Sequence, residues 1–283
     1  MMSIKKKLEL LITLLLAFFS TSLAKRFVFR KALHLTFSHF KSHHEGEVEI
    51  LLLPYLLKKD SAFIDIGANK GLYCYYSEKI ISASQIIAFE PIPKLAHLIR
   101  KLFPKISTVE KALSDENGKA ILNIPIHNQN YLIDTRSTLE KDSPELLGRF
   151  ETISVDVITL DDYLKSSGID NIGLIKIDVE GHELKLLSGA KKTLLEKRPS
   201  MIIEIEPINH PNGLDKAFAL VHQFNYTIFY FCLDTLSLKL AYNNIAKVSI
   251  PTNSSLAIHN YVCFPIERAD DVNKINLELK KQG

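Results

Sequence analysis

The sequence predicts an α/β fold in which a mostly parallel sheet carries helices on both faces. From about Glu47 onward, short apolar segments with strand character alternate with amphipathic segments at helical spacing, and this alternation is typical of parallel sheets. A glycine-containing turn follows the first apolar segment, and a carboxylate ends the second. In such sheets the turns and strand ends gather at one edge, where ligands bind.

The elements can be assigned in order along the chain. Pro91 and Pro93 are tolerated only at the start of a helix, so they predict the beginning of a helix that runs to Leu102. Thr159 is the expected cap of a helix over Leu160–Lys165 because its side chain can accept a backbone hydrogen bond. The predicted helices cover residues 47–57, 71–81, 91–102, 160–165 and 184–194. The predicted strands cover residues 62–68, 86–90, 108–113, 120–124, 153–158, 174–178, 201–206, 226–233 and 261–266, with a meandering polar segment between the last two.

Composition narrows the function classes. The chain has 283 residues, of which 46% are hydrophobic, so it can bury one substantial core. Its formal charge is only +3, and it has no long basic block interleaved with aromatic residues. Nucleic acid is therefore not favoured as a partner. Cys74, Cys232 and Cys263 are far apart and form no C-x-x-C pair, which indicates reduced thiols in a cytosolic protein. We expect an N-terminal extension over 1–45, one domain over 46–270 and a polar tail over 271–283.

The N-terminal extension allows three interpretations. Three lysines precede an apolar run from Leu8 to Ala24 that ends in small residues, which is typical of a secretory signal. The run is somewhat short for a membrane span. A docking helix is the third interpretation, and the basic, aromatic segment from Lys25 to Lys41 could then lie on an anionic membrane surface. The turn after the first strand indicates a cofactor that occurs inside cells, which favours a cytoplasmic protein at the inner face of a membrane.

The turn after the first strand predicts a pocket for an adenosine-containing cofactor. Gly67 and Gly71 are spaced G-x-x-x-G, with Asp65 before them and Asn69 between them. Small residues let the backbone approach a ligand closely, and Glu90 at the tip of the next strand is placed to bind ribose hydroxyls. The turn has neither the G-x-G-x-x-G nor the G-x-x-x-x-G-K-[ST] pattern. An acidic entrance instead suits the cationic end of S-adenosylmethionine, although an ordinary turn with a buried Asp65 would have the same residues.

Several further motifs follow in a fixed order. Together with the turn they are Asp65-Ile-Gly-Ala-Asn-Lys-Gly71, Glu90-Pro-Ile-Pro93, Ala112-Leu-Ser-Asp115 with Gly118, Ser137-Thr-Leu139, Thr159-Leu-Asp-Asp-Tyr163 and Lys176-Ile-Asp-Val-Glu-Gly-His-Glu183. With these motifs the chain resembles the FkbM family of S-adenosylmethionine-dependent methyltransferases over roughly residues 46–210. The resemblance implies a class I methyltransferase fold, with a seven-stranded, mainly parallel sheet, an antiparallel final strand and helices on both faces.

By analogy with that fold, the turn holds the methionine end of the cofactor and Glu90 holds the ribose. Ala112 to Asp115 would lie near the adenine, although Asp115 could simply cap its own turn. The expected cofactor-binding residues are Asp65, Gly67, Asn69, Gly71, Glu90, Ala112 and Asp115.

Methyl transfer to a hydroxyl requires alignment of the acceptor and a group that takes its proton. Asp178, Glu180 and His182 follow a buried strand at the ligand-binding edge, so we expect them to be catalytic, with His182 as the proton acceptor. Each also has a structural alternative: Asp178 could organise the sulfonium end, Glu180 could cap the next helix, and His182 could lie on the surface. Lys176 is expected in an ion pair. Magnesium held by Asp178 and Glu204 is an alternative, but the spacing is not diagnostic and we predict no metal.

Residues 126–150 are polar and lack clear periodicity, which is typical of a functional lid or an insertion. The stretch from Asp134 to Thr138 in this segment is predicted to close over the acceptor. The expected substrate-binding residues are Arg136, Ser137 and Thr138.

The sequence therefore predicts an O-methyltransferase that acts on a small molecule, sugar or glycan. It has no Asn-Pro-Pro-Tyr or Asp-Pro-Pro-Tyr run after the fourth strand, which disfavours methylation of nucleobase amines. One alternative is a nucleotide-sugar or dinucleotide-dependent enzyme on a Rossmann-like fold. The other is a membrane-associated interaction protein that binds the cofactor without turnover. The sequence leaves the acceptor, the methylated atom and the oligomeric state open.

Overall fold

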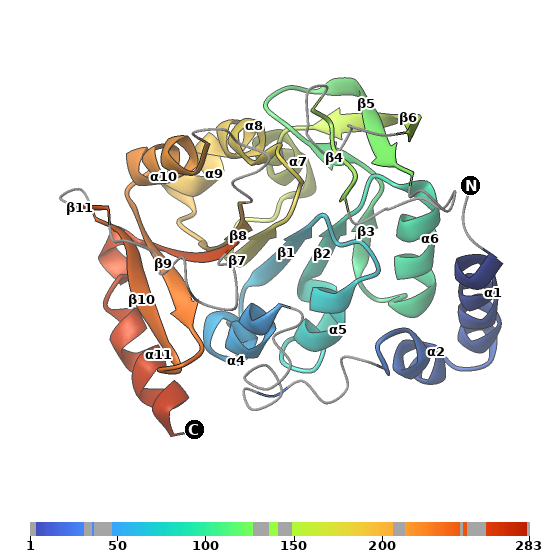
Figure 1. Cartoon of the computed structure of the whole chain (residues 1–283), viewed down its shortest axis with the longest axis horizontal. Helices are drawn as coiled ribbons and strands as arrows, with labels where there is room; N and C mark the ends of the chain where they lie inside the picture. The colour runs from blue at the N-terminus through green and yellow to red at the C-terminus, as the bar shows by residue number, and fades with distance from the viewer. Residues whose placement is uncertain are drawn as a thin grey trace.

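The computed structural model describes residues 4–30, 36, 47–126, 136–140, 149–205, 213–243, 246–247 and 259–281. Within these residues a nine-stranded sheet has the order β11-β10-β9-β12-β8-β7-β1-β2-β3, and it crosses the molecule between two layers of helices (Figure 1). Its strands are β1 (Ala62–Ile66), β2 (Ile86–Phe89), β3 (Ser107–Val109), β7 (Ile172–Ile177), β8 (Ser200–Glu204), β9 (Tyr226–Cys232), β10 (Ser237–Asn243), β11 (Ala246–Lys247) and β12 (Asn260–Pro265).

The predicted parallel sheet is confirmed, and the strand number is larger than expected. The strands from β3 through β2, β1 and β7 to β8 are parallel, and β12 lies antiparallel between β8 and β9. These strands make up the expected seven-stranded arrangement, and β10 and β11 extend it beyond β9. The prediction of a meandering polar segment was therefore wrong at β10, where the alternation of Leu236, Leu238 and Leu240 indicates a strand.

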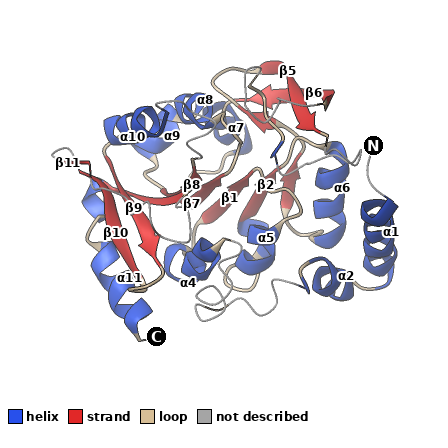
Figure 2. Cartoon of the chain, in the orientation of Figure 1, coloured by secondary structure: helices blue, strands red, loops and turns tan. Residues whose placement is uncertain are grey.

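Side chains alternate along each strand, which gives the sheet two apolar faces. Phe63, Leu174 and Ile202 are fully buried on one face, and burying a side chain of this size contributes about 1.5–3 kcal/mol. The helices α5 (Leu72–Ser77) and α6 (Pro93–Leu102) cover this face, while α7 (Leu160–Ser167), α8 (Glu183–Gly189), α9 (Lys191–Glu196) and α10 (Gly213–Gln223) cover the other. Figure 2 shows these two helical layers around the strands.

The alternation continues into polar residues at the carboxyl ends of the same strands. Asp65, Lys176 and Glu204 each follow one of the buried apolar residues by two positions, so they point to the face that α5 covers. In the strand register Asp65 lies opposite Lys176. The fold thus concentrates charged groups at one edge of the sheet.

Local signals explain most helix ends. Thr159 caps α7 as predicted, because its Oγ1 accepts the Asp162 N–H at 3.1 Å. The predicted helix over 47–57 instead consists of a 3₁₀ turn, η2 (Val48–Leu52), and the single turn α4 (Leu53–Leu56). Pro54 lies in the first turn of α4 and cannot donate a backbone hydrogen bond, so it marks the start of a new helical segment.

A second, three-stranded sheet lies at the edge of the first. Its order is β4-β6-β5, with β4 (Ala112–Leu113), β5 (Gly118–Pro125) and β6 (Phe150–Ile158). The predicted third strand over 108–113 therefore splits between the two sheets, because Glu110 and Lys111 separate β3 from β4. A small apolar cluster that includes Leu122, Ile124 and Val155 fills the space beneath this second sheet.

The apolar N-terminal run forms two helices rather than one. α1 (Ile4–Phe19) ends before Ser20, whose Oγ accepts the Leu23 N–H and caps α2 (Thr21–Val28). Both helices pack against α6 (Figure 1). Among the helices that the structure describes, none combines the length and the apolar character needed to cross a bilayer. Most of the predicted surface-binding segment after Arg30 lies outside the described residues.

The segment predicted as a polar tail is helical for most of its length. Residues Asp271–Lys280 form α11, which packs on β10 and buries Val272, Ile275 and Leu279. These three side chains lie at helical spacing, so their pattern indicates an amphipathic helix. The expected domain boundaries themselves stay predictions.

Candidate active site

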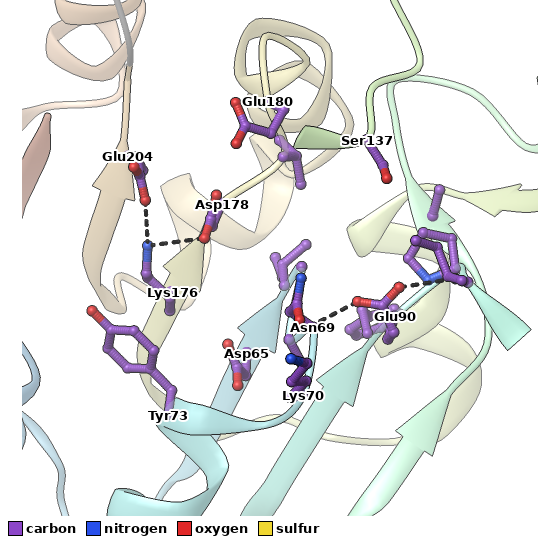
Figure 3. A pocket seen from close by; sticks show the side chains of 18 of the residues that line it. Asp65, Asn69, Lys70, Tyr73, Glu90, Ser137, Lys176, Asp178, Glu180 and Glu204 are labelled. Atoms are coloured by element: carbon purple, nitrogen blue, oxygen red, sulfur yellow. Dashed lines mark hydrogen bonds and ion pairs between the residues drawn. The ribbon is translucent and has the colours of Figure 1, made fainter. Parts of the chain in front are cut away.

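A cavity of about 520 Å³ lies at the carboxyl edge of the parallel strands. The ends of β1, β2, β7 and β8 form its floor, and α2, the second sheet and the 136–140 segment contribute to its walls. Its volume is within the range of about 300–1,000 Å³ that is usual for small-molecule sites. Figure 3 shows Asn69 and Glu90 at one end of this cavity and Tyr73, Lys176 and Glu204 at the other.

The turn after β1 has left-handed residues and lies against the end of β7. Gly67 has φ +77°, and a Cβ there would come within 1.9 Å of the Asp178 carbonyl oxygen. Asn69 is also left-handed, with φ 50°. Gly67 lines the cavity as predicted, but the neighbouring main chain, rather than a ligand, requires the missing side chain.

Gly71 has a different role from the one predicted. It begins α5 in the left-handed conformation, with φ +85°, and a Cβ would come within 2.8 Å of the Phe103 ring. It is not among the residues that line the cavity. The second glycine of the motif therefore serves the helix start and its packing.

Glu90 lines the cavity directly after β2 and is only 4% exposed. Its Oε2 accepts the Asn69 N–H at 2.8 Å, and its Oε1 accepts the Ile92 N–H at 2.9 Å. These bonds fix the carboxylate between the turn and the start of α6. A carboxylate offers about four acceptor positions, so these two bonds do not saturate the group.

The structure separates the two residues predicted to lie near the adenine. Ala112 is buried and lines the cavity. Asp115 is exposed, accepts the Ser114 hydroxyl at 2.9 Å and does not line the cavity. The turn between β4 and β5 carries it away from the site, and the interpretation of Asp115 as a turn residue is the one that fits.

Asp65 is a buried carboxyl on the cavity floor, with 2% of its surface exposed. Burial raises its pKa to about 7, and the Cys74 thiol, which donates to Oδ2 at 3.3 Å, opposes this rise. A cationic ligand would stabilise its ionised form.

Lys176 lies in the middle of a group of carboxylates and is 1% exposed. Its Nζ is 3.5 Å from Glu204 Oε2 and 3.8 Å from both Asp178 Oδ2 and Glu47 Oε2, and it donates to Asn260 Oδ1 at 3.2 Å. Burial opposes its charge, but Asp178 and the other carboxylates prevail and raise its pKa. The predicted ion pair of Lys176 is confirmed, and it has several partners.

The predicted catalytic residues all line the cavity, but they differ in what they can do. Burial raises the pKa of Asp178 well above its usual range, against the effect of the Lys176 ammonium. Glu180 is left-handed, with φ 39°. The Gly181 N–H donates to Glu183 Oε1 at 3.0 Å, where α8 begins.

His182 is buried, and both of its ring nitrogens have partners. Nδ1 lies 2.6 Å from Glu140 Oε1 and Nε2 lies 2.8 Å from the Ser114 hydroxyl. His182 and Lys185 lower the pKa of Glu140 to about 2. The ring thus connects the 136–140 segment to the end of β4 and to the start of α8, and it is not on the surface.

Of the three predicted substrate-binding residues, two line the cavity and one does not. Arg136 and Ser137 line the cavity, whereas Thr138 is buried outside its lining. The Thr138 hydroxyl donates to the Glu180 carbonyl at 2.6 Å, and its backbone pairs with Asn123. Thr138 thus fastens this segment to the cavity wall. Asp134 and Thr135, which the same prediction covered, lie outside the described residues.

Sequence reasoning missed Tyr73, Glu47 and Phe29, which also line the cavity. Phe29 stacks on Tyr75 with ring centres 4.8 Å apart, and Lys25 in α2 bonds to Glu78 at 2.6 Å. No sequence motif marks these residues, because their positions depend on how α2 and α5 pack. In the part of the chain that the structure describes, no group of His, Cys, Asp or Glu has the geometry of a metal site.

Comparisons with known proteins agree on one family. Residues 65–228, more than half of the chain, match the methyltransferase FkbM domain. The 2-O-methyltransferase NoeI of Sinorhizobium fredii is 29% identical over 160 residues, which cover 52% of this chain and 64% of that protein. The 31-O-demethyl-FK506 methyltransferase FkbM of Streptomyces tacrolimicus is 23% identical over 199 residues, which cover 61% of this chain and 75% of that protein.

Among solved structures, a methyltransferase FkbM from Methylobacillus flagellatus aligns with a TM-score of 0.47 and 14% identity. The alignment covers 87% of this chain and 55% of that one. The matches to NoeI and to two fungal methyltransferases span about two thirds of the length of those relatives, from 64% to 67%.

Proposed function

Because the chain belongs to the FkbM methyltransferase family, we propose that it transfers a methyl group from S-adenosylmethionine to a hydroxyl oxygen of a small molecule, sugar or glycan. The observation that carries this proposal is the position of Asp65 and Glu90 on one cavity. Two adjacent parallel strands each present a carboxylate there, one beside the glycine turn and one at the next strand end.

The residues present fit the cofactor. Glu90 is held by two backbone N–H groups and can accept further hydrogen bonds from ribose hydroxyls. Asp65 is suited to the cationic methionine end because a cation would offset the cost of ionising it at this depth. When bound, S-adenosylmethionine supplies an electrophilic methyl group on a sulfonium. Ala112 lines the same cavity, and we assign it to the apolar wall against the adenine.

Oxygen is the proposed methyl acceptor because the names of two relatives specify it. One relative is a 2-O-methyltransferase and the other a 31-O-demethyl-FK506 methyltransferase. A small-molecule or glycan acceptor is consistent with the volume of the cavity.

We assign removal of the acceptor's proton to Asp178. Its carboxylate reaches the cavity, and burial makes the ionised form more basic, while Lys176 keeps that form accessible. The hydroxyl proton passes to Asp178 as the oxygen takes the methyl group. We assign His182 a positioning role, because Glu140 and Ser114 occupy both of its nitrogens.

Glu90→Ala tests the cofactor site. Removing a charge-assisted hydrogen bond costs roughly 1.5–3 kcal/mol, so we expect S-adenosylmethionine affinity to fall about tenfold or more in calorimetry. Glu110→Ala is the matched control, because Glu110 is outside the cavity lining and its side chain forms an exposed ion pair with Arg100. Tight binding of a nicotinamide dinucleotide by the wild-type protein, with no binding of S-adenosylmethionine, would instead support the dinucleotide enzyme.

Asp178→Asn tests the chemistry. We expect turnover to fall about 10²–10⁴-fold, as for loss of a general base, with cofactor affinity within about threefold of wild type. The measurement is release of S-adenosylhomocysteine in the presence of acceptor. Unchanged turnover would contradict the role of Asp178, and cofactor binding without turnover in the wild type would favour an interaction protein.

We further propose that α1 and α2 rest on an anionic membrane surface at the cytoplasmic side. Leu11, Leu15 and Phe18 lie on one side of α1 and are 55%, 54% and 84% exposed. The sequence adds three lysines at the start of α1, and Arg26 and Arg30 follow in and after α2. Apolar side chains flanked by basic residues favour binding at the interface of anionic lipids.

A further inference from the structure

One end of the cavity contains polar groups that have no hydrogen-bond partner within the described part of the chain. The hydroxyl of Tyr73 is buried, and no residue that the structure describes is placed in hydrogen-bond geometry with it, although Glu47 lies close enough to raise the pKa of the phenol. Glu47 Oε2 also has no hydrogen bond in the described part of the chain, and its ion-pair partner there is the Lys176 ammonium at 3.8 Å. Tyr73 as a whole is only 4% exposed, and both residues line the cavity. Buried polar atoms are rarely left without a hydrogen bond, so the Tyr73 hydroxyl and Glu47 Oε2 together favour a ligand at this end of the cavity.

Both groups surround the buried ammonium of Lys176. Its Nζ lies 5.2 Å from the centre of the Tyr73 ring and 3.8 Å from Glu47 Oε2. Figure 3 shows Tyr73 on the same side of the cavity as Lys176, Asp178 and Glu204, away from Asn69 and Glu90. The Tyr73 hydroxyl and Glu47 Oε2 therefore lie at the end of the cavity opposite the proposed ribose site.

The protonation state of Tyr73 makes it a hydrogen-bond donor. Burial, followed by the nearby Glu47 and Glu49 carboxylates, raises the pKa of its phenol well above the usual value. The phenol therefore keeps its proton at neutral pH. Glu47, in contrast, contributes an acceptor oxygen.

The charge balance at this end disfavours anions. A single ammonium, Lys176, faces the carboxylates of Glu47, Asp178 and Glu204 at 3.5–3.8 Å. Even with Asp178 protonated, as its raised pKa favours, the Glu47 and Glu204 carboxylates outnumber this ammonium. An anionic ligand would be repelled by them, since like charges repel strongly at low dielectric. A neutral hydroxyl avoids this repulsion and can accept from Tyr73 while it donates to Glu47.

We propose that Tyr73, Glu47 and Lys176 form the acceptor subsite, which takes an uncharged molecule with neighbouring hydroxyls, such as a glycosyl residue, and rejects anionic counterparts. This inference rests on the proposed methyl transfer for the position of the reaction. One acceptor hydroxyl binds Tyr73 and Glu47, and a neighbouring one faces Asp178 and loses its proton. Tyr73 and Glu47 thereby determine specificity without taking part in the chemistry.

The test compares neutral and charged acceptors of the same shape. Methyl glycosides of common hexoses are each paired with the corresponding methyl uronide and hexose 6-phosphate, and labelled methyl transfer from S-adenosylmethionine is measured. We expect label in neutral glycosides and at least tenfold less in either charged partner. Cofactor affinity is measured separately by calorimetry on the full chain.

Two substitutions assign the effect to these residues. Tyr73→Phe removes only the hydroxyl, so we expect the KM of the neutral glycoside to rise about tenfold while kcat and the cofactor Kd change less than twofold. Glu47→Gln should narrow the preference for the neutral glycoside over its uronide several-fold. Tyr76→Phe, on the same helix but outside the cavity lining, should change none of these values.

The possible outcomes separate the two proposals. If the wild-type protein binds no S-adenosylmethionine, the proposed function fails and this inference fails with it. If it binds the cofactor but labels charged acceptors as well as neutral ones, or labels no glycoside, only the acceptor subsite is overturned. An unchanged KM in Tyr73→Phe also overturns it, because the hydroxyl would then have a purely internal role.

Discussion

Gly67 connects the two strands that carry most of the site. Its left-handed backbone and the missing side chain let the turn after β1 touch the Asp178 carbonyl at the end of β7. The main chains on the cofactor side and the acceptor side therefore meet directly. Any side chain at this position would push the two strand ends apart.

Gly67→Ala should destabilise the protein far more than a matched glycine substitution. Gly168 is also left-handed, with φ +70°, but a Cβ there would meet no atom within 4 Å, so Gly168→Ala should cost only the backbone strain of about 1–2 kcal/mol. We expect roughly twice that cost or more for Gly67→Ala, measured by urea unfolding. Equal losses for the two variants would contradict the close contact.

At the scale of single residues, sequence reasoning succeeded where the position of a side chain follows from its own strand. Asp65, Glu90 and Asp178 were predicted at the cavity because they end parallel strands, and they line it. Tyr73 was missed because α5 has only six residues, and the face it turns inward depends on packing against the sheet. Asp115 was misplaced because the turn after β4 leads out of the site.

The 136–140 segment acts as a strap across the cavity. Thr138 attaches it to Asn123 and to the Glu180 carbonyl. Glu140 attaches its other end to His182 and to Lys185. The strap thus links the small sheet to the turn that carries the predicted catalytic residues, and it presents Arg136 and Ser137 to the cavity.

Loosening the strap should affect the acceptor more than the cofactor. Glu140→Gln removes a charged partner of His182, and hydrogen bonds to charged groups contribute about 1.5–3 kcal/mol. We expect the KM of the acceptor to rise several-fold, and the Kd of S-adenosylmethionine to change less than about twofold. Asp156→Asn, which alters only an exposed pair with Lys119, is the control. A larger effect on the cofactor than on the acceptor would contradict the assignment.

At the scale of elements, local chemistry predicted some boundaries and not others. Thr159 and Pro93 mark helix starts through their own backbone and side-chain properties, and both assignments agree with the structure. The division of the predicted third strand has no such local cause. Whether Ala112 pairs with the main sheet or with β6 depends on strands that lie more than forty residues away.

The whole molecule consists of the predicted seven-stranded core with additions at both ends. β10, β11 and α11 extend one edge of the sheet, and α1 and α2 cover α6 near the other (Figure 1). The core could be predicted because each strand has its own apolar pattern. Of the additions, a helical N-terminal extension was predicted, whereas β10 and α11 were missed although their apolar side chains follow strand and helix spacing.

The proposed membrane contact is a property of the molecule as a whole. Full-length protein should sediment with vesicles that contain anionic lipid more than with purely zwitterionic vesicles, and high salt should weaken this binding. Leu15→Asp with Phe18→Asp should reduce binding at least fivefold, since a charge would replace an apolar contact. Leu277→Asp, at a position in α11 that is 62% exposed, is the control. Equal binding by all three proteins would contradict the proposal.

The small sheet has a consequence for how this protein could acquire new acceptors. The chain leaves the main sheet after β3, forms the small sheet at the rim of the cavity, and returns to the main sheet through α7. It therefore enters this rim once and leaves it once. The rim, with its strap, could be exchanged as a unit while the strand ends beneath it kept their spacing. The selectivity for the acceptor could then change while the distance between the acceptor and the methyl donor stayed the same. The rim is therefore the part of the protein to exchange in order to change the acceptor.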